Sequence, residues 1–463
     1  MSKTNIHINR VAGFCSAIVL IVLLVIVNIT IASGLIPGLS PEIDESQSQL
    51  IRRESMNVCV EGQFVDRNGQ AITLPGGPGQ IAQIIEDECY SFLIGYRTTT
   101  KKLSGLRKQL LTYLYFGGED GVGAQVSLTT DNGLQAFCYE ALGQKEGSVI
   151  VMDANTGELL AITSRSSAEL GYDADQYQQR YDEYTSANEA FWYDRCVFCE
   201  DPPGSTFKIV TAAALLENGM GDYVYDDLSG AYEVPNGAIH NVNNRIYGAG
   251  VTLEKGLNKS VNVYFASAAV ELGAHRIMKT MNSLRFDEDI VTDFCRIKSP
   301  FSMSDVNTKA ELAQAGYGQG RLTMSPLHIS MIMGAVMNDG VMVTPYVINQ
   351  ILDDGADRTG EIHPKGQAGG STQAFSSDTA GTLKKYLHST AVGYGFTEDR
   401  YGMVYAKTGT ADQHNGKNHV YMLVGLETQQ RDYAILIDAR NVDQTSSSLK
   451  SSAFSIVEYI LSM

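Results

Sequence analysis

Residues 202–219 read PPGSTFKIVTAAALLENG and hold the most informative short motif of the chain. Prolines precede Ser205 and Gly219 ends the apolar run, which predicts a helix that begins near Phe207. Ser205 then lies at a helix N-terminus, where outward-pointing N–H groups favour developing negative charge. Lys208 follows on the same helix face, so we expect its amine within reach of the Ser205 hydroxyl. The pattern predicts a serine nucleophile beside a lysine base.

Two further strings follow in an order that suits acyl transfer. Ser260-Val261-Asn262 offers a hydroxyl that can relay a proton and an amide that can hold a peptide. Lys407-Thr408-Gly409-Thr410-Ala411 offers a strand that can bind a carboxylate. Ser-x-x-Lys and Ser-x-Asn arise by chance in most chains of this length, whereas Lys-Thr-Gly-Thr-Ala arises in roughly one chain in several thousand. Each string alone fits ordinary structure, but the ordered set predicts an active site.

Length and charge set broad limits. The 463 residues allow roughly two to four domains with a large core. The formal net charge of −17 argues against nucleic-acid binding and fits a well-solvated surface. The motifs call for no cofactor, and we find no pattern that predicts a metal site.

The N-terminus predicts a membrane anchor. Residues 11–40 carry no charge, and residues 17–27 read AIVLIVLLVIV, a stretch long enough to span a bilayer as a helix. Lys3 and Arg10 precede it and acidic residues follow, so the basic end should stay in the cytoplasm. A cleaved signal peptide is the alternative, although its apolar core is usually shorter. We therefore expect a single-pass protein whose bulk is extracytoplasmic.

Seven cysteines are present, and six of them would face the exterior, where disulfides can persist. Cys196-Val197-Phe198-Cys199 could be a redox or zinc motif. A single CxxC without a second ligand pair is weak evidence for either. A local disulfide or two unreactive thiols is the favoured interpretation.

The rest of the chain alternates helical and strand-like patterns. Asn68-Gly69 lies between two short apolar runs and predicts a hairpin, and Asp131 should cap a helix. Strands are predicted at residues 147–153, 159–163, 341–352, 404–410, 421–426 and 433–437, and helices at 103–115, 379–387 and 447–462, with a mainly helical region at 253–324 and a long loop at 168–194. This mixture predicts a mixed α/β (α+β) fold, with a mainly antiparallel sheet flanked by helices and a helical subdomain.

Together these motifs resemble the class B penicillin-binding proteins, membrane-anchored D,D-transpeptidases of peptidoglycan synthesis. The likeness includes Asp66-Arg67-Asn68-Gly69, Leu128-Thr129-Thr130-Asp131, Thr156-Gly157-Glu158 and Gly316-Tyr317-Gly318-Gln319-Gly320, and it covers about residue 60 to the C-terminus. The short N-terminal region is most similar to the penicillin-binding protein A group. The resemblance implies a cytoplasmic tail (1–10), a transmembrane anchor (11–33), a linker with a small pedestal domain (34–125) and a transpeptidase domain (126–463).

Roles for the motif residues follow from the resemblance. Ser205 would form the acyl-enzyme with D-Ala-D-Ala stem peptides or β-lactams, with Lys208 as base and Ser260 as proton relay. Substrate would be bound by Asn262, Lys407, Thr408, Gly409 and Thr410, and the backbone N–H groups of Ser205 and Thr410 would form the oxyanion hole. No metal takes part.

The sequence departs from the family at a few places. Glu189 stands where relatives usually have arginine, Arg107 stands where many have glutamate, and the strand Val420–Val424 lacks the usual tryptophan. None of these changes removes a catalytic group. They affect what can be said of substrate detail and partner contacts.

Other functions remain open. A D,D-carboxypeptidase would send water to the same acyl-enzyme, and a non-catalytic β-lactam receptor would signal through a membrane segment. Glu254-x-x-Leu257-Asn258 mimics a β-lactamase motif but precedes Ser260, so we interpret it as a helix turn. An intact motif set argues against a silent scaffold. The resemblance also implies a multi-span glycan polymerase of the SEDS type as partner, and a bacterial cell-membrane location.

Overall fold

The computed structural model describes residues 56–85, 87–97, 103–116, 121–165, 194–197, 201–235, 237–302, 306–363, 370–413 and 416–463. The expected anchor (11–33) and most of the expected loop at 168–194 lie outside these residues. Within the described ranges no helix has the length and apolar character needed to cross a bilayer. Residues Cys59–Met463 form one compact unit, and the fold below is that of this unit.

A five-stranded antiparallel sheet lies at the centre of the unit, with strand order β17-β18-β19-β5-β6. The strands are β5 (Gly147–Asp153), β6 (Leu159–Arg165), β17 (Val404–Gln413), β18 (Lys417–Glu427) and β19 (Asp432–Val442). All seven residues of β5 are buried, which explains its continuous run of apolar residues. The sequence-based prediction of these strands is confirmed, although β17, β18 and β19 extend beyond the predicted ends.

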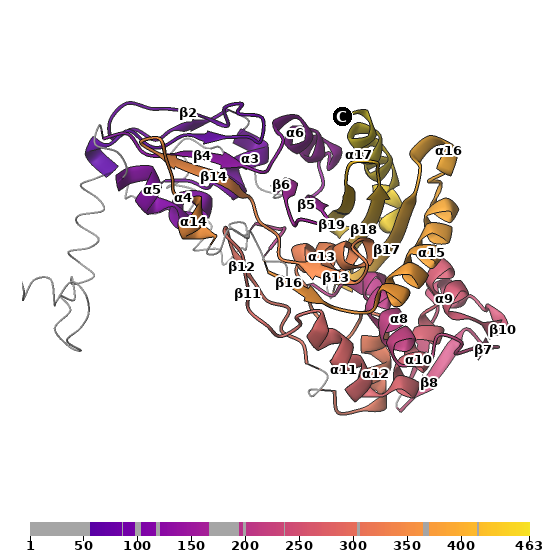
Figure 1. The fold of residues 1–463 in the computed structure, drawn as a ribbon. Coiled ribbons are helices and arrows are strands. Elements are labelled where there is room, and N and C mark those ends of the chain that lie inside the picture. Colours follow the sequence, from indigo (N-terminus) through magenta and orange to yellow (C-terminus); the bar gives the residue numbers. More distant parts are fainter. Residues whose placement is uncertain are drawn as a thin grey trace, which may run out of the picture. The chain divides into compact units, whose positions relative to one another are not determined.

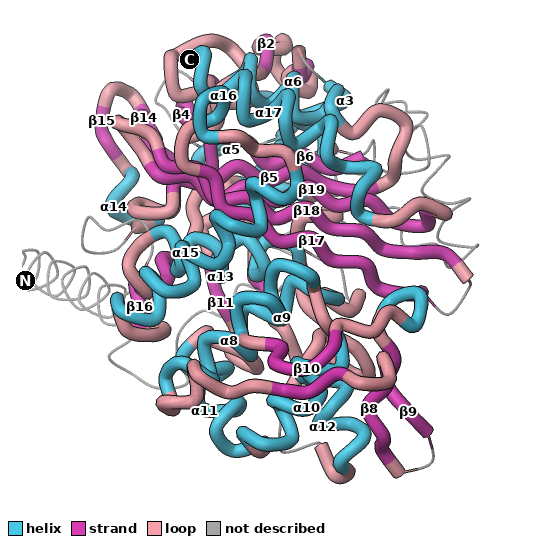
Figure 2. Tube along the Cα trace, turned by 90° about the vertical axis from the view of Figure 1, so that its right-hand side faces the viewer, coloured by secondary structure: helices cyan, strands magenta, loops and turns pink. Residues whose placement is uncertain are grey.

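Helices cover both faces of the sheet (Figure 2). On one face α6 (Asn132–Ala141) and α17 (Lys450–Ser462) pack on side chains such as Val149 and Ile437. On the other face α13 (Pro326–Met337) lies so close that a Cβ on Gly334 would meet Met152 Cε at 2.7 Å. The predicted cap of α6 is confirmed, because Asp131 Oδ1 accepts a hydrogen bond from the Leu134 N–H at 3.0 Å.

The remaining helices lie beside the sheet's β17 edge and below its α13 face (Figure 1). They are α8 (Lys208–Glu217), α9 (Leu253–Lys259), α10 (Asn262–Leu272), α11 (Ala274–Ser283), α12 (Lys309–Gly316), α15 (Ser377–Tyr394) and α16 (Glu398–Tyr401). Short strands accompany them: β7 (Tyr225–Asp227), β8 (Ala231–Val234), β9 (Gly237–His240), β10 (Gly248–Val251), β11 (Ile290–Val291) and β12 (Arg296–Ile297). The predicted helical region at 253–324 is thus confirmed except for β11 and β12.

The N-terminal part contains small elements: β1 (Phe64–Val65), β2 (Thr73–Leu74), β3 (Gln83–Ile84), α3 (Asp87–Ile94), α4 (Gly105–Gln109), α5 (Leu111–Phe116) and β4 (Gln125–Leu128). The predicted hairpin at Asn68-Gly69 is confirmed by the hydrogen bond from the Ile72 N–H to the Phe64 carbonyl at 2.9 Å. The helical stretch predicted at 103–115 is confirmed for most of its length, but it is divided into α4 and α5 at Leu110, whose φ and ψ of −101° and 20° are not helical.

A second sheet joins this N-terminal part to a later segment, with strand order β1-β4-β14-β15. The later elements are β13 (Val341–Val343), β14 (Ile348–Asp353), β15 (Ala356–Asp357), α14 (Thr359–Ile362) and β16 (Ser371–Gln373). The one strand predicted at 341–352 is therefore two, because β13 pairs with β16 whereas β14 pairs with β4. The N-terminal strands and the C-terminal half share backbone hydrogen bonds.

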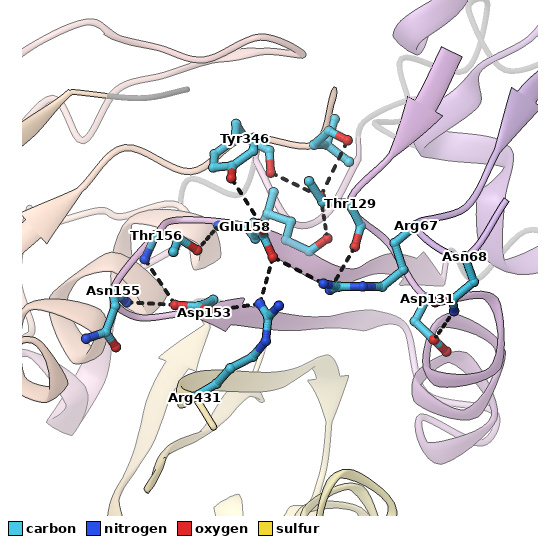
Figure 3. Close-up of polar contacts among 12 residues, drawn as sticks. Arg67, Asn68, Thr129, Asp131, Asp153, Asn155, Thr156, Glu158, Tyr346 and Arg431 are labelled. Carbon is cyan, nitrogen blue, oxygen red and sulfur yellow. Dashed lines mark hydrogen bonds and ion pairs between the residues drawn. The ribbon is translucent and has the colours of Figure 1, made fainter. Parts of the chain in front are cut away.

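Three of the strings that carry the family resemblance meet where the second sheet approaches the central sheet. They are the strings that contain Arg67, Thr129 and Glu158 (Figure 3). Glu158 lies at the centre: its Oε2 is 2.7 Å from Arg431 Nη1 and 3.4 Å from Arg67 Nη2. Its Oε1 accepts a hydrogen bond from the Tyr346 hydroxyl at 3.3 Å. Arg431 also pairs with Asp153 at 2.9 Å. The junction therefore links segments that are far apart in the sequence through paired charges.

Candidate active site

Ser205 lies where the sequence predicts it, at the start of a helix. A 3₁₀ turn, Gly204–Phe207, runs directly into α8, and Gly219 beyond the end of α8 has a φ of +69°. Ser205 is half-buried, whereas Thr206, Phe207 and Lys208 are buried. Its hydroxyl donates no hydrogen bond to any described residue.

Glycines allow the backbone around Ser205 to pack closely. Gly204 has a φ of +53°, and a Cβ there would meet Thr410 O at 2.8 Å and Thr410 N at 3.1 Å. A Cβ on Gly318 would meet Gly204 O at 1.9 Å, and one on Gly409 would meet Pro203 O at 2.9 Å. These positions require glycine because a side chain would displace the Ser205 loop from β17. The predicted oxyanion-hole residues, Ser205 and Thr410, thus belong to backbone segments in close contact.

The Lys208 ammonium is held by the second motif. It donates to Ser260 O at 2.8 Å, to Ser260 Oγ at 3.0 Å and to Asn262 Oδ1 at 2.8 Å. We expected it to reach the Ser205 hydroxyl, but no hydrogen bond joins the two among the described residues. Spacing along one helix therefore does not reveal the partners of Lys208, which come from the Ser260–Asn262 string.

Ser260 connects the two lysines. Lys407 Nζ also donates to Ser260 Oγ at 3.0 Å, so one hydroxyl lies between both amines. Ser260 ends α9 in the left-handed region, with a φ of 54° and a ψ of 46°. Such a conformation costs a non-glycine residue roughly 1–2 kcal/mol, and it turns both the Ser260 carbonyl and hydroxyl toward Lys208. Strain of this kind often accompanies function.

Burial determines the charge state of the two lysines. Both side chains are fully buried, and no carboxylate among the described residues forms an ion pair with either. Desolvation, with a contribution from nearby Lys407, lowers the pKa of Lys208 well below its ordinary value. Desolvation lowers the pKa of Lys407 to about 7. The lowered pKa of Lys208 favours its neutral amine, the form that can act as a base.

Asn262 begins α10 and is held at both ends of its amide. Besides accepting from Lys208, it donates from Nδ2 to the His240 carbonyl at 3.0 Å. The β8–β9 hairpin that presents this carbonyl packs through Ile239 on Ala266 and Ala313. One Nδ2 hydrogen remains to bind a peptide carbonyl.

The Lys-Thr-Gly string lies on β17, the edge strand beside α8. Lys407 reaches Ser260, and Gly409 lies against the Ser205 loop at Pro203. Thr408 and Thr410 alternate with them on the strand: Thr408 Oγ1 is 3.0 Å from the Tyr394 hydroxyl, and Thr410 Oγ1 accepts from the Ser446 N–H at 3.3 Å. The structure thus brings together Ser205, Lys208, Ser260, Asn262, Lys407 and Gly409, while both threonine hydroxyls have contacts with other protein groups.

Several residues that shape the site carried no recognised functional signal. Gly204 and Gly318 could have been found from the glycine before Ser205 and from the glycine-rich string at 316–320. His240 acts through its carbonyl, which no sequence pattern reveals. Tyr394 supports Thr408 from α15, and nothing in the sequence links the two.

Within the described residues, the part of the CxxC motif that includes Cys196 shows no feature of a redox or zinc site. The Cys196 thiol is free and buried, 3.4 Å from Ser164 Oγ, and burial raises its pKa well above the ordinary value. Such a thiol is a poor nucleophile and metal ligand. Cys199 lies outside the described residues. No group of three or more His, Cys, Asp or Glu side chains that could hold a metal ion occurs within the described ranges.

Glu254-x-x-Leu257-Asn258 is part of α9, as the helix-turn interpretation predicts. Asn258 contacts α15 through a 2.6 Å hydrogen bond from Thr390 Oγ1 to its Oδ1.

Comparison with known proteins agrees with this geometry. The family model "Penicillin binding protein transpeptidase domain" matches residues 147–461. Penicillin-binding protein 3 of Bacillus subtilis is 25% identical over 358 residues, which is 70% of this chain and 49% of that protein. The peptidoglycan D,D-transpeptidase PbpA of Mycolicibacterium smegmatis is 23% identical, covering 70% of this chain and 68% of that protein. The chain thus matches only about half of the length of the Bacillus relative.

Solved structures share the fold. A ceftriaxone acyl-enzyme complex of penicillin-binding protein A from Mycobacterium tuberculosis has a TM-score of 0.77 at 19% identity, covering 88% of this chain and 99% of that chain. The D,D-transpeptidase domain of a peptidoglycan glycosyltransferase from Eggerthella lenta has a TM-score of 0.76 at 23% identity, covering 87% and 98%. The mixed α/β fold is therefore that of known penicillin-binding proteins. With the family model matching well over half of its residues, the chain belongs to the penicillin-binding protein family and carries its serine-type transpeptidase domain.

Proposed function

We propose that this protein crosslinks peptidoglycan stem peptides by D,D-transpeptidation, through an acyl-enzyme on Ser205 that β-lactams also form. The observation that supports this best is the Ser260 hydroxyl, which lies 3.0 Å from the amines of both Lys208 and Lys407. Both amines have a lowered pKa. This arrangement suits proton transfer to and from a serine nucleophile.

In the first half-reaction a neutral Lys208 takes the proton of Ser205, whose Oγ forms a bond to the carbonyl carbon of the penultimate D-Ala. The bond from this carbon to the terminal D-Ala nitrogen then breaks. Ser260 passes a proton to the leaving amine and takes one from the protonated Lys208, which returns to its neutral form. The backbone N–H groups of Ser205 and Thr410 stabilise the oxyanion. In the second half-reaction the amine of another stem peptide attacks the acyl carbon and loses a proton through Ser260 to Lys208. The ester bond to Ser205 then breaks, and Ser205 Oγ takes that proton from Lys208.

Substrate recognition is assigned to the neighbouring motif residues. Asn262 orients the peptide amide, and a protonated Lys407 attracts the terminal carboxylate. Thr408, Gly409 and Thr410 complete the binding strand. Binding a carboxylate favours the charged form of Lys407, which burial alone disfavours.

Water could replace the acceptor amine, which would make the protein a D,D-carboxypeptidase. A non-catalytic β-lactam receptor would stop at the acyl-enzyme. Neither alternative is favoured by a specific feature of the site, and both share Ser205, Lys208 and Ser260 with the transpeptidase.

The N-terminal assignments are also proposals. Residues 11–33 form a transmembrane anchor, residues 1–10 lie in the cytoplasm, and the transpeptidase domain (126–463) lies outside the bacterial cell membrane. Residues 34–125 provide a linker and a pedestal. A SEDS-type glycan polymerase would contact the anchor and the pedestal. The uncharged run at 11–40 supports the anchor, and the family resemblance supports the partner.

Intact mass of the full chain after incubation with penicillin tests this function. We expect one adduct of the drug's mass, which Ser205→Ala abolishes. A crosslinked product from a stem-peptide donor and an amine acceptor then separates transpeptidation from carboxypeptidation, which releases D-Ala without crosslinking. A folded wild-type protein that forms no adduct and hydrolyses no drug would contradict the proposal.

A further inference from the structure

A buried histidine lies beside the loop that carries Ser205, and the catalytic cycle above does not use it. His419 on β18 has no exposed surface. Its Nδ1 is 2.9 Å from Asp201 Oδ2, and its Nε2 is 2.9 Å from Asp438 Oδ1. One partner belongs to the loop before Ser205 and the other to β19 in the centre of the sheet. The imidazole therefore bridges the loop and the sheet.

Tyr421 extends this bridge on the same face of β18. Its ring stacks on that of His419, with centroids 4.2 Å apart. Its hydroxyl is 2.9 Å from His419 Nδ1 and donates to the Pro202 carbonyl at 3.0 Å. Tyr421 also lies next to Gly409, where an added Cβ would meet its Cδ2 at 3.2 Å. The tyrosine thus contacts both the loop and the Lys-Thr-Gly strand.

The loop needs such support because of its composition. Pro202 and Pro203 have no N–H to donate, so backbone hydrogen bonds there can come only through carbonyls. Asp201 is the nearest charged residue before Ser205, and its carboxylate also pairs with Arg440 Nη2 at 2.7 Å. The Asp201 carbonyl accepts from the Met324 N–H at 3.1 Å. Side-chain contacts from the sheet therefore determine where this loop lies.

Hydrogen-bond directions indicate how the bridge works. Ionised carboxylates only accept, and the Tyr421 proton is given to Pro202. Each ring nitrogen of His419 lies at hydrogen-bond distance from a carboxylate, one on the loop and one on the sheet. Arg440 pairs with Asp201, and Asp438 also accepts from Ser148. The cluster therefore joins the loop to the sheet through several polar contacts, unlike the lysines of the site, which have no carboxylate partner among the described residues.

We propose that His419 is a positioning residue for Ser205: fixed on Asp438, it holds Asp201, while Tyr421 stacked on its ring holds the Pro202 carbonyl, and together they set the position of the nucleophile. This inference rests on the proposed acylation of Ser205. A misplaced nucleophile lowers the rate of the chemical step far more than it weakens the initial binding of the drug.

Acylation of the full chain by a fluorescent penicillin tests the proposal, with the first-order acylation rate constant and the apparent dissociation constant measured separately. For His419→Gln we expect the rate constant to fall about 10–100-fold, with the dissociation constant within about threefold of wild type. Asp201→Asn, on the loop side, should lower the rate constant in the same way, and Tyr421→Phe should have a smaller effect.

His363→Gln is the matched control. His363 is also buried and hydrogen-bonded, 3.1 Å from the Ile348 carbonyl and 3.5 Å from Asp293, but Ile348 lies on β14 of the second sheet and Asp293 in the turn between β11 and β12. It should lose stability and keep the wild-type rate constant. Equal rate constants for wild type and folded His419→Gln would overturn the inference, as would an equal loss in His363→Gln. Should His419→Gln fail to fold, an unchanged rate constant in Asp201→Asn would overturn it. A wild-type protein that is not acylated would contradict the proposed function instead.

Discussion

Two regions of this molecule bury positive charge, and they do so in opposite ways. In the active site Lys208 and Lys407 are fully buried beside a serine and an asparagine, with no carboxylate paired to them among the described residues. In the N-terminal region Arg107 is equally buried, but its Nε lies 2.6 Å from Glu61 Oε1, and its Nη2 donates to the Ala82 carbonyl at 2.6 Å.

The difference separates chemistry from structure. A buried cation without a counter-ion is costly, and a lysine relieves the cost by losing its proton, which produces a base. Arginine keeps its charge in proteins and so needs a partner. The buried lysines of the active site, which have no carboxylate partner among the described residues, supply a base for the reaction. The Arg107–Glu61 pair instead holds chain segments together. Substitutions in the two regions should therefore affect different quantities.

The largest effect is expected from Lys208→Met. This change removes the proposed base and should lower the acylation rate constant about 10²–10⁴-fold, while the protein stays folded. Stopped-flow measurements with a fluorescent penicillin check it. Lys384→Met, which breaks a half-buried 3.0 Å pair with Glu427, is the control and should keep the wild-type rate. A Lys208→Met protein with wild-type acylation would show that the base lies elsewhere.

The opposite result is expected from Arg107→Met. Removing the arginine leaves Glu61 buried without its partner, and the free energy of unfolding should fall by about 3–5 kcal/mol. Acylation per folded molecule should not change. Denaturant titration measures the loss. The double variant Glu61→Met/Arg107→Met should recover part of it, since no charge then remains buried. A single variant as stable as wild type would contradict the role given to this pair.

The pH dependence should distinguish the unpaired lysines from paired charges. Burial lowers the folded-state pKa of Lys407 to about 7, whereas an unfolded lysine titrates near ~10.4. Between these values the unfolded chain binds more protons than the folded chain, so this lysine makes stability rise with pH across the window. Below about pH 7 both states are protonated, and its contribution to stability stays constant at its lowest value. Over the same window the folded protein loses the protonated form of Lys407, which is the form that binds a carboxylate. The dissociation constant of the drug should therefore rise by up to about tenfold per pH unit.

Lys407→Met is the comparison for this prediction. The unfolding free energy and the drug dissociation constant are measured for both proteins across this pH range. The difference between wild type and variant isolates the contribution of Lys407 from that of other groups that titrate in the same range. A stability difference that does not change with pH would show that Lys407 keeps its charge throughout the window. A dissociation constant that depends equally steeply on pH in the variant would show that another group causes that dependence.

The sequence predicted the local parts of this fold well. The buried run of β5, the Asp131 cap and the proline-to-glycine punctuation around α8 each depend on residues close in the chain, so their patterns are readable. It also identified the residues that gather at the site. The helix break at Leu110 was missed because the apolar spacing continues across it.

Contacts between distant segments could not be predicted. The partners of Lys208 depend on the left-handed conformation of Ser260, which a serine gives no reason to expect. His419 and Asp201 are 218 residues apart in the chain. Arg107 was recognised as a departure from the family, but only the structure shows that Glu61 compensates it. Such pairings follow from the packing of the whole sheet, not from spacing.

The smallest effect is expected at the junction around Glu158. Its charges are paired, but they are less buried than those of the other two regions. Its charge is paired, as at Arg107, but its side chain and those of Arg67 and Arg431 are 21%, 23% and 29% exposed. Exposed pairs contribute little and are screened by salt, so Glu158→Gln should cost only about 1 kcal/mol in the free energy of unfolding and leave acylation unchanged. Repeating the unfolding measurement in about 1 M sodium chloride sharpens the comparison, since screening then acts within ~3 Å. The Glu158→Gln loss should shrink in salt, while the Arg107→Met loss should persist because water and ions do not reach that pair. Equal salt sensitivity of the two losses would mean that burial does not distinguish them.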